Sequence, residues 1–187
     1  MFDLADLEPE KVRPLRRTDY ERLVEMGAFA DERVELLYGM VVSMTPIGPA
    51  HEEAVDRLTA LLVGALGSRA RVRVQNSLAS PTSESIPQPD LAVVPPADYS
   101  RRRPDRALLV VEVAESSLRK DQRVKARLYA ESGVPEYWIV NLADGRIEVH
   151  RDPADGAYRT RTEHGRGEAV TLLGFPDVYV RVDDVLP

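Results

Sequence analysis

The sequence contains no cysteine among its 187 residues. Disulfide bonds, thiolate metal sites and cysteine nucleophiles are therefore excluded. Any bound metal must be held by oxygen or histidine ligands. The lack of cysteine is also compatible with a reducing compartment.

Long apolar stretches are missing as well. No hydrophobic run approaches the roughly 18 residues that identify a membrane-spanning helix. The first residues, MFDLADLEPEKV, are acidic and lack the apolar core of a signal peptide. We therefore expect a cytoplasmic protein without a membrane segment.

Two common catalytic and binding motifs are absent. The chain has neither a phosphate-cradling glycine-rich loop nor a Gly-x-Ser-x-Gly elbow. These absences argue against a nucleotide cofactor and against an esterase of the common type.

A net basic charge is also lacking, since the formal net charge is -6. This balance argues against a protein that coats nucleic acid non-specifically, although local basic patches can still bind phosphates. Arginines are clustered at 101–103, and they alternate with Ala or Val over 69–75. These arginines could contact phosphate or could simply be solvated.

One domain is expected over residues 1–187, with a mobile segment over about 1–15, because no linker rich in Gly, Ser or Pro divides the chain. Thr18 and Glu21 fit a capping box that opens a short helix, which Gly27 can close. Periodicity and turn residues predict the remaining elements. These are a hairpin (33–38 and 40–44), an amphipathic helix (51–66), strands (69–75, 91–94 and 107–113), a helix (118–132), a second hairpin (136–141 and 146–151) and further short strands near Tyr158, Val170, Leu172 and Val180.

Two acids stand in apolar strands, Asp90 in QPDLAVV and Glu112 in LLVVEVA. The strand around Glu112 is apolar on both faces, which is typical of a central strand. Apolar packing gives no reason for a carboxylate, because a buried charge needs a partner, a metal or a proton. A structural alternative is that Asp90 caps the start of its strand and Glu112 pairs with a neighbouring arginine.

The helix predicted over 118–132 carries two charged residues on its apolar side. At about 100° per residue, Asp121 and Lys125 fall inside the stripe formed by apolar residues. A buried lysine needs a carboxylate beside it. A local i, i+4 pair would explain the spacing of the two residues but not their inward direction. The stripe consists of Leu118, Val124, Leu128 and Tyr129.

This set of residues favours metal-assisted hydrolysis of a phosphodiester. Asp90 and Glu112 would hold Mg²⁺, or Mn²⁺, while Lys125 offsets negative charge or acts on the attacking water. Glu35, from the first hairpin, is a third candidate carboxylate. His51 lies on the apolar face of its helix, and could equally be a buried or capping histidine. Supporting positions around the acids are assigned to His51, Asp121 and Gln88.

The longer run of motifs resembles the Uma-type family of restriction endonucleases in the PD-(D/E)xK nuclease superfamily. The resemblance covers about residues 15–185. It implies an α/β fold with a restriction-endonuclease-like mixed central sheet flanked by helices, with additional β-hairpins. It also implies a Mg²⁺-dependent DNA endonuclease. The matching segments are RVELLYGMVVSM, QPDLAVV, VVEVAESS, Asp121, Lys125, Tyr129 and GVPEYWIVN.

One departure from the superfamily pattern concerns the lysine that normally follows the second acid by two residues. Ala114 occupies that position. In the family that the chain resembles, the following helix supplies the lysine, and Lys125 matches this arrangement. Two alternatives stay open: a catalytically inactive nuclease-fold module that binds nucleic acid or a protein, and a metal-dependent hydrolase of smaller phosphoesters. A homodimer is also expected, because cutting both strands of a duplex is simplest with two sites.

Overall fold

The computed structural model describes residues 13–187, so most of the segment expected to be mobile lies outside the described residues. The chain forms two compact units. The smaller comprises residues up to Met44 together with Glu84–Ile86, and the larger comprises Thr45–Ser83 and Pro87–Pro187. One domain over the whole chain stays a prediction. No helix in residues 13–187 is long and apolar enough to cross a membrane.

The smaller unit contains one helix and the first predicted hairpin. Helix α1 spans Arg17–Glu25, and strands β1 (Val34–Leu37) and β2 (Met40–Ser43) pair antiparallel, as predicted. Gly39, in the turn between them, has φ 78°, and a Cβ there would lie 2.4 Å from Cβ of Pro14. The hairpin turn therefore requires glycine at this position.

The capping box predicted at Thr18 is wrong. Thr18 lies inside α1, the N-cap residue is Arg16, and no side chain caps the helix from that position. The amide of Arg17 instead donates to the carboxylate of Glu84, which is 67 residues away in sequence. The acceptor for this amide at the start of the helix is therefore Glu84, whereas the local sequence pattern predicted a neighbouring side chain.

The larger unit contains the remaining strands and helices, and nearly all follow the predicted order. Strand β4 begins and ends where the sequence predicted, and β7 is longer than expected. The elements are α2 (Pro49–Leu66), η2 (Gly67–Arg69), β3 (Arg71–Val74), β4 (Leu91–Val94), β5 (Leu109–Ala114), α3 (Leu118–Lys120), η3 (Asp121–Lys125), α4 (Ala126–Glu131), β6 (Glu136–Asn141), β7 (Arg146–Ala154), β8 (Ala157–Gly165), β9 (Ala169–Leu172), β10 (Phe175–Arg181) and α5 (Val182–Val185).

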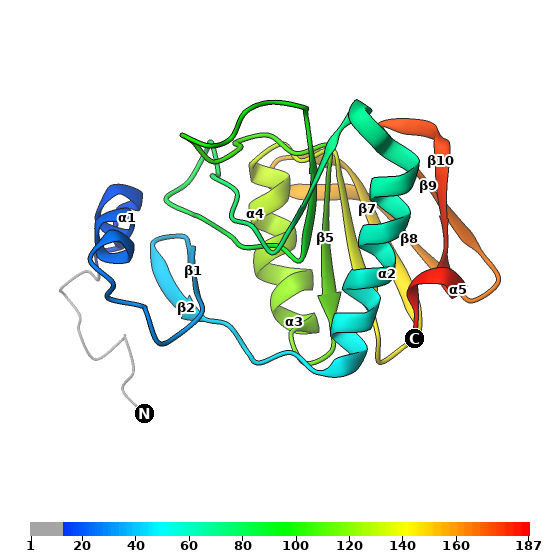
Figure 1. Ribbon diagram of the computed structural model, residues 1–187, viewed down its shortest axis with the longest axis horizontal. Helices are drawn as coiled ribbons and strands as arrows, with labels where there is room; N and C mark the ends of the chain where they lie inside the picture. Colours follow the sequence, from blue (N-terminus) through cyan, green and yellow to red (C-terminus); the bar gives the residue numbers. More distant parts are fainter. Residues whose placement is uncertain (1–12) are drawn as a thin grey trace. The chain divides into compact units, whose positions relative to one another are not determined.

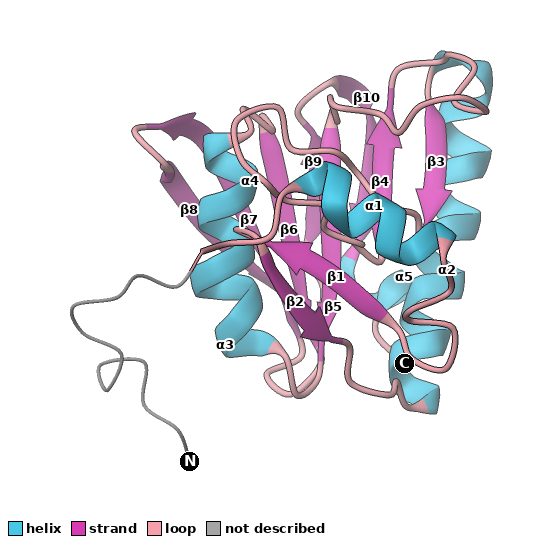
Figure 2. Cartoon of the chain, turned by 90° about the vertical axis from the view of Figure 1, so that its left-hand side faces the viewer, coloured by secondary structure: helices cyan, strands magenta, loops and turns pink. Residues whose placement is uncertain are grey.

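Six strands form one mixed sheet in the order β3-β4-β5-β6-β7-β8. Within this sheet only β5 and β6 pair in parallel, because the segment from α3 to α4 crosses over between them. Strands β3 and β8 lie at the two edges (Figure 2), and β9 and β10 form a separate antiparallel pair. The predicted mixed α/β fold with additional hairpins is confirmed.

Side chains alternate between the two faces of this sheet, and each face has its own apolar core. Residues of α2, α5, β9 and β10 pack with Leu91, Val93 and Val111 on one face. On the other face, Tyr129 of α4 packs with Ala92, and so do residues of neighbouring strands. Figure 1 shows α2 and α4 on opposite sides of β5. The central strand is therefore covered on both faces, as its apolar run predicted.

The helix expected over 118–132 is interrupted by one π-helical turn, η3. The amide of Ala126 donates to the carbonyl of Asp121, five residues earlier, instead of four. Asp121 and Lys125 are buried, as predicted. Val124 was predicted to face the core and is 37% exposed, because the wider turn changes the angle between successive residues. Lys120, one residue before this turn, is half-buried.

Candidate active site

Asp90 lies immediately before β4 and beside the central strand. Strands β4 and β5 pair Leu91 with Val111, so one further step in the antiparallel register places Asp90 opposite Glu112. Oδ2 of Asp90 accepts the amide of Val113 at 2.8 Å. Asp90 thus caps the start of its strand, as the structural alternative proposed, while lying next to the second acid. Asp90 remains 8% exposed.

His51 connects the start of α2 to Asp90. Its Nε2 lies 3.1 Å from Oδ2 of Asp90. Burial lowers the pKa of His51, but the hydrogen bond and the charge of Asp90, with smaller contributions from Glu115 and Asp121, outweigh burial and raise that pKa above its usual value. The protonated imidazole is therefore favoured beside Asp90. Nδ1 of His51 is buried and has no hydrogen-bond partner among the described residues.

Glu112 is engaged by two side chains of the following helical segment. Nζ of Lys125 donates to Oε1 at 2.9 Å, and the hydroxyl of Tyr129 donates to the same oxygen at 2.7 Å. All three residues are at most 4% exposed. The alternative partner expected for Glu112 was an arginine, and the structure shows lysine and tyrosine instead.

Asp121 is the third acid of the cluster. Burial raises the pKa of its carboxyl group, and Asp90 acts in the same direction, whereas Lys125 and the hydroxyl of Ser117 oppose the rise. Ser117 donates to Oδ2, while Oδ1 is buried and has no hydrogen-bond partner in the described chain. A buried carboxylate oxygen without a donor is uncommon in structures and is costly when the group is ionised.

The π-helical turn is anchored to the sheet on either side of this cluster. The hydroxyl of Tyr137 donates to the carbonyl of Asp121 at 3.2 Å, and the side-chain amide of Gln122 lies 3.0 Å from both carboxylate oxygens of Glu148. Burial raises the pKa of Tyr137, followed by the charges of nearby acids that include Asp121 and Glu112. The sheet therefore holds the turn that presents Lys125 to Glu112.

Two predicted site residues lie outside the strands and helices that form this cluster. Glu35 is buried in β1 of the smaller unit, so its catalytic role stays a prediction. Gln88 donates from its side chain to the carbonyl of Gln75 at 3.0 Å, which ties the end of β3 to the segment before Asp90. Ala114, at the position of the usual strand lysine, is fully buried.

Tyr129 and Ser117 were not predicted as site residues. Tyr129 was identified only as part of the apolar stripe and of the family pattern, yet it is 1% exposed and donates to Glu112. A buried tyrosine normally needs a partner for its hydroxyl group, and Tyr129 lies four residues after Lys125, on the same side of an α-helix. That spacing was the available signal.

The donor set has the chemistry of a magnesium site but not a complete set of protein ligands. No group of three or more His, Cys, Asp or Glu residues within 13–187 is arranged to hold a metal ion. Mg²⁺ often binds through one or two carboxylates and keeps several waters. Asp90 and Glu112, with the unsatisfied oxygen of Asp121 nearby, fit that mode of binding.

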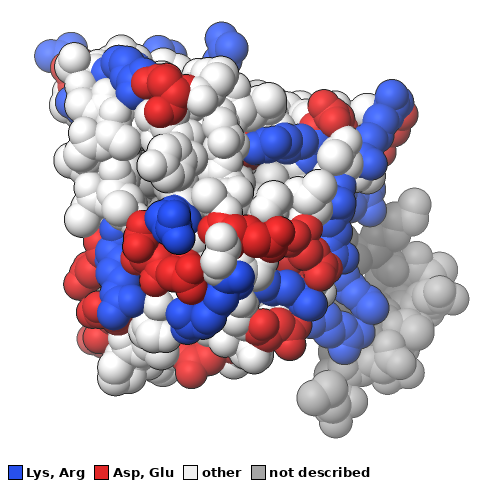
Figure 3. Space-filling view, turned by 90° about the vertical axis from the view of Figure 1, so that its right-hand side faces the viewer, with Lys and Arg blue, Asp and Glu red and all other residues white. Residues whose placement is uncertain are grey.

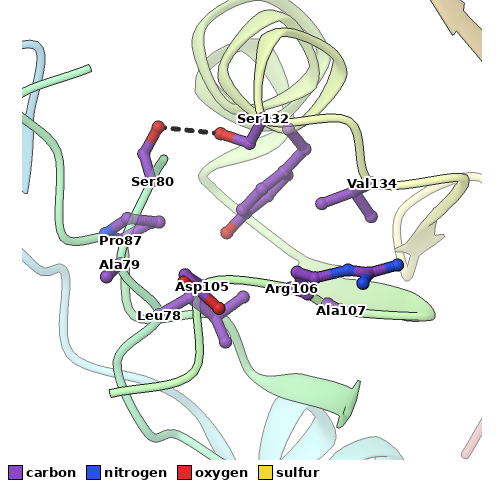
Figure 4. Close-up of a pocket in the computed structure, with 10 residues that line it drawn as sticks. Leu78, Ala79, Ser80, Pro87, Asp105, Arg106, Ala107, Ser132 and Val134 are labelled. Carbon is purple, nitrogen blue, oxygen red and sulfur yellow. Dashed lines mark hydrogen bonds between the residues drawn. The ribbon is translucent and has the colours of Figure 1, made fainter. Parts of the chain in front are cut away.

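A small cavity lies beside Tyr129 and the loop before β5 (Figure 4). It measures about 10 Å³, which is enough for about one water molecule. Ser80 and Ser132, which both line it, are joined by a 2.8 Å hydrogen bond. The cavity is too small for a substrate, so the candidate site is the acid cluster and not this pocket.

Comparison with known proteins identifies the family. The Uma2 family model, described as "Putative restriction endonuclease", matches residues 17–183. A crystal structure of a "putative nuclease belonging to DUF820" from Anabaena variabilis is similar in fold, with a TM-score of 0.75 and 12% identity over 92% of this chain and 97% of that chain. No curated protein matches the chain. Because the family model spans most of its length, the chain belongs to the Uma2 family, described as putative restriction endonucleases.

Proposed function

We propose that this protein is a metal-dependent DNA endonuclease whose site is built from Asp90, Glu112 and Lys125. The observation that carries the proposal is the register of β4 and β5, which brings the two acids to the same end of adjacent strands while Lys125 donates to Glu112 at 2.9 Å. Membership of the family supports DNA as the substrate.

Asp90 and Glu112 would hold a divalent cation, Mg²⁺ or Mn²⁺, through their carboxylate oxygens. When bound, such a cation supplies Lewis acidity towards a phosphate oxygen. The oxygen of Asp90 that is available to a cation is Oδ1, because the amide of Val113 and the side chain of His51 both contact Oδ2. Oδ1 of Asp121 adds a further oxygen that has no donor among the described residues.

The remaining residues orient these acids and supply positive charge. Lys125 carries an ammonium group that is held against Glu112 and can offset the negative charge of a phosphate. Tyr129 fixes Oε1 of Glu112 through its hydroxyl, and His51 fixes Oδ2 of Asp90. Burial of the cluster excludes much of the solvent, which strengthens electrostatic interactions within it.

Metal binding and cleavage together test the proposal. Calorimetric titration with Mg²⁺ and Mn²⁺ should show binding by the parent protein and loss of binding by Asp90→Ala. The exposed Asp98→Ala is a matched control and should bind as the parent does. The parent protein and Asp98→Ala should cleave plasmid and genomic DNA, and Asp90→Ala should not. Binding that is unchanged in Asp90→Ala contradicts the proposed site, whatever DNA is used.

A non-catalytic module is the second candidate, favoured by one observation. The position of the strand lysine is filled by Ala114, which is buried among apolar residues. A module that only binds nucleic acid or a protein has no need for the acids to bind metal, so the absence of Mg²⁺ and Mn²⁺ binding would favour it. Metal-dependent turnover of a nitrophenyl phosphodiester without DNA cleavage would favour a hydrolase of smaller phosphoesters.

We also propose that two copies of the chain act together as a homodimer. Cleavage of both strands of a duplex is simplest with two sites, and closed two-fold dimers are the commonest oligomers. Light scattering at the concentration used for cleavage should give twice the mass of the chain. A monomeric mass would contradict this part of the proposal.

A further inference from the structure

Two arginines on edge strand β3 have no acidic partner among the described residues. Arg71 and Arg73 form no ion pair within 13–187, and Nε of Arg73 is buried without a hydrogen-bond partner there. The side chain of Arg73 makes one long hydrogen bond, of 3.4 Å, to Asn76. Arg69, just before β3, shows the usual arrangement, since it pairs with Asp177 at 2.7 Å.

The same two arginines stack against one aromatic ring. The guanidinium carbons of Arg71 and Arg73 lie 6.0 Å and 5.5 Å from the ring centre of Tyr99. Tyr99 is fixed in turn by its hydroxyl, which donates to the carbonyl of Pro95 at 2.8 Å. Tyr99 therefore holds two cations close together on the surface of the sheet.

The charges of the two arginines repel one another. Burial lowers the pKa of Arg73 and the charge of Arg71 lowers it further, while Tyr99 acts in the opposite direction. Asp98 is near enough for Arg71 to contribute to the lowered pKa of its carboxyl group, after the larger effect of hydrogen bonds from Ser100, but the two do not form an ion pair. Two like charges held on one ring, with no ion pair to an acid within residues 13–187, suit a site whose anion comes from outside the chain.

Many charges elsewhere on the surface are paired. On the face shown in Figure 3, basic and acidic side chains lie next to one another. Other exposed arginines, such as Arg119 and Arg181, also form no ion pair within residues 13–187. The β3 arginines are set apart because both contact the same aromatic ring.

The β3 arginines share a sheet face with the candidate active site. Arg73 pairs with Ala92 in the register of β3 and β4, and Ala92 is two residues from Asp90. Side chains directly opposite in an antiparallel pair lie on the same face, which here is the face of Glu112 and Tyr129. Two residues along a strand span about 6.8 Å. Arg73 is therefore one strand over and two residues along from Asp90, and Arg71, opposite Val94, is two residues further away. Glu112 lies on β5, two strands from β3.

We propose that Arg71 and Arg73 form a phosphate-binding surface that holds the DNA backbone beside the acid cluster. Arginine suits this role, because its planar group matches phosphate geometry and stacks on aromatic rings at the same time. The exposed Arg101 and Arg102 follow Tyr99 in the same loop and extend the basic segment. That the bound anion is DNA rests on the proposed function. The observation that these two arginines form no ion pair within residues 13–187 is independent of that function.

Sequence-independent binding provides the test, because contacts to phosphate do not require the recognition sequence. A fluorescein-labelled DNA duplex of arbitrary sequence is titrated with full-length protein in EDTA, and anisotropy is followed over a series of KCl concentrations. The variant Arg71→Gln/Arg73→Gln removes two charges. The control Arg57→Gln/Arg159→Gln removes two charges from arginines that are paired with acids.

The affinity of the parent should fall linearly with salt on logarithmic axes. The slope of the β3 variant should be less steep by about 0.9 for each phosphate that its arginines no longer neutralise. The control should keep the parental slope. The melting temperature of the β3 variant should stay equal or rise, because two like charges are removed. Parental affinity and slope in the β3 variant, or no DNA binding by the parent, would overturn the inference.

The two proposals fail separately. Binding is measured without divalent metal, so it does not depend on cleavage. If the parent cuts DNA and the β3 variant binds normally, the phosphate-binding surface is wrong and the endonuclease stands. If the parent never cuts DNA or binds metal but the β3 variant loses binding, the endonuclease is wrong and the surface stands.

Discussion

Two buried carboxylates in the same sheet, those of Glu136 and Asp90, are used in different ways. Glu136 is fully buried, and both of its oxygens accept hydrogen bonds: Oε1 from Trp138 and Arg151, and Oε2 from the amide of Leu173. Asp90 receives its contacts on Oδ2, and Oδ1 accepts no hydrogen bond from the described residues.

The difference distinguishes an acid that holds the fold together from one that has capacity for a ligand. A saturated carboxylate has no free lone pair in a useful direction, and it links the strands that supply its donors. An acid with one oxygen left over gains less from the fold and can bind something from outside. Asp121 resembles Asp90 and differs from Glu136, because its Oδ1 has no hydrogen-bond donor among residues 13–187.

The largest expected effect on stability comes from Glu136→Ala. The substitution removes the acceptor of the Trp138 indole and of the Leu173 amide, and it leaves Arg151 with the carbonyl of Thr171 alone. Removal of one partner of a buried pair costs about 3 to 5 kcal/mol. Urea unfolding should show this loss. Asp90→Ala, compared in the same way, should cost clearly less, and equal losses would contradict the distinction between the two acids.

Lys125→Ala should have the largest effect on cleavage after loss of an acid. Removal of one charge-stabilising donor from a preorganised site costs about 2.7 to 4 kcal/mol, or about 10² to 10³ in rate. Rates with Mg²⁺ measure the effect, and melting curves must accompany them, because Asp121 would lose the cation that most strongly stabilises its charged form.

Arg123→Ala is the matched control for Lys125, since Arg123 lies in the same π-helical turn and is exposed. It should cleave at the parental rate. If Lys125→Ala also cleaves at the parental rate while Asp90→Ala is inactive, a lysine supplied by the helix is not part of the mechanism.

Tyr129→Phe should give a smaller effect that appears in metal dependence. Phenylalanine preserves the packing of the ring and removes the donor to Oε1 of Glu112. A hydrogen bond to a charged group contributes about 1.5 to 3 kcal/mol. More Mg²⁺ should then be needed for half-maximal cleavage. Tyr158→Phe, which removes a bond to the carbonyl of Val134, should leave the metal dependence unchanged.

The two buried histidines should change stability with pH in opposite directions. The pKa of His51 is raised, so its contribution is complete below pH 6.5, its ordinary pKa, and is lost as pH rises through its folded value. Burial, followed by Arg161, lowers the pKa of His150, so its contribution is present above pH 6.5 and lost as pH falls through its folded value. In His51→Gln, the fall in melting temperature with rising pH should disappear. In His150→Gln, the fall in melting temperature with falling pH should disappear. The same slopes in both variants would contradict these directions.

The smallest expected effect is that of Asp121→Asn on stability. Because burial raises the pKa of Asp121, ionisation costs folded stability as pH rises above 3.8 through the folded pKa. The variant should therefore melt slightly above the parent at neutral pH, and the difference should shrink in acid. A lower melting temperature at neutral pH would show that Lys125 and Ser117 stabilise the charged form fully.

Regular apolar patterns predicted most of the fold. Strand β4 and the central position of β5 followed from runs that are apolar on both faces, and the direction of Lys125 followed from helical periodicity. These features depend on burial alone, and the spacing of apolar residues in the sequence predicts burial directly.

Features that depend on distant partners were not predictable. The π-helical turn requires donors and acceptors from other strands, such as Tyr137 and Glu148, and a single sequence does not show that they lie nearby. The start of α1 depends on Glu84 in the same way. In the site, the sequence indicated which acids matter but not which of their oxygens remains without a donor.

The five-residue turn has a consequence for chain length. Arg123 lies in it with an exposed side chain, so many residue types should be accepted there. A π-helical turn closed from residue i to i+5 covers nearly the same rotation as an α-helical turn closed from i to i+4, so it accommodates one extra residue without changing how α3 faces relative to α4. Deletion of Arg123 would therefore restore a regular α-helix, with Leu128 and Tyr129 still in the core and Asp121 still facing the sheet. At this point the molecule should tolerate both substitution and the loss of one residue.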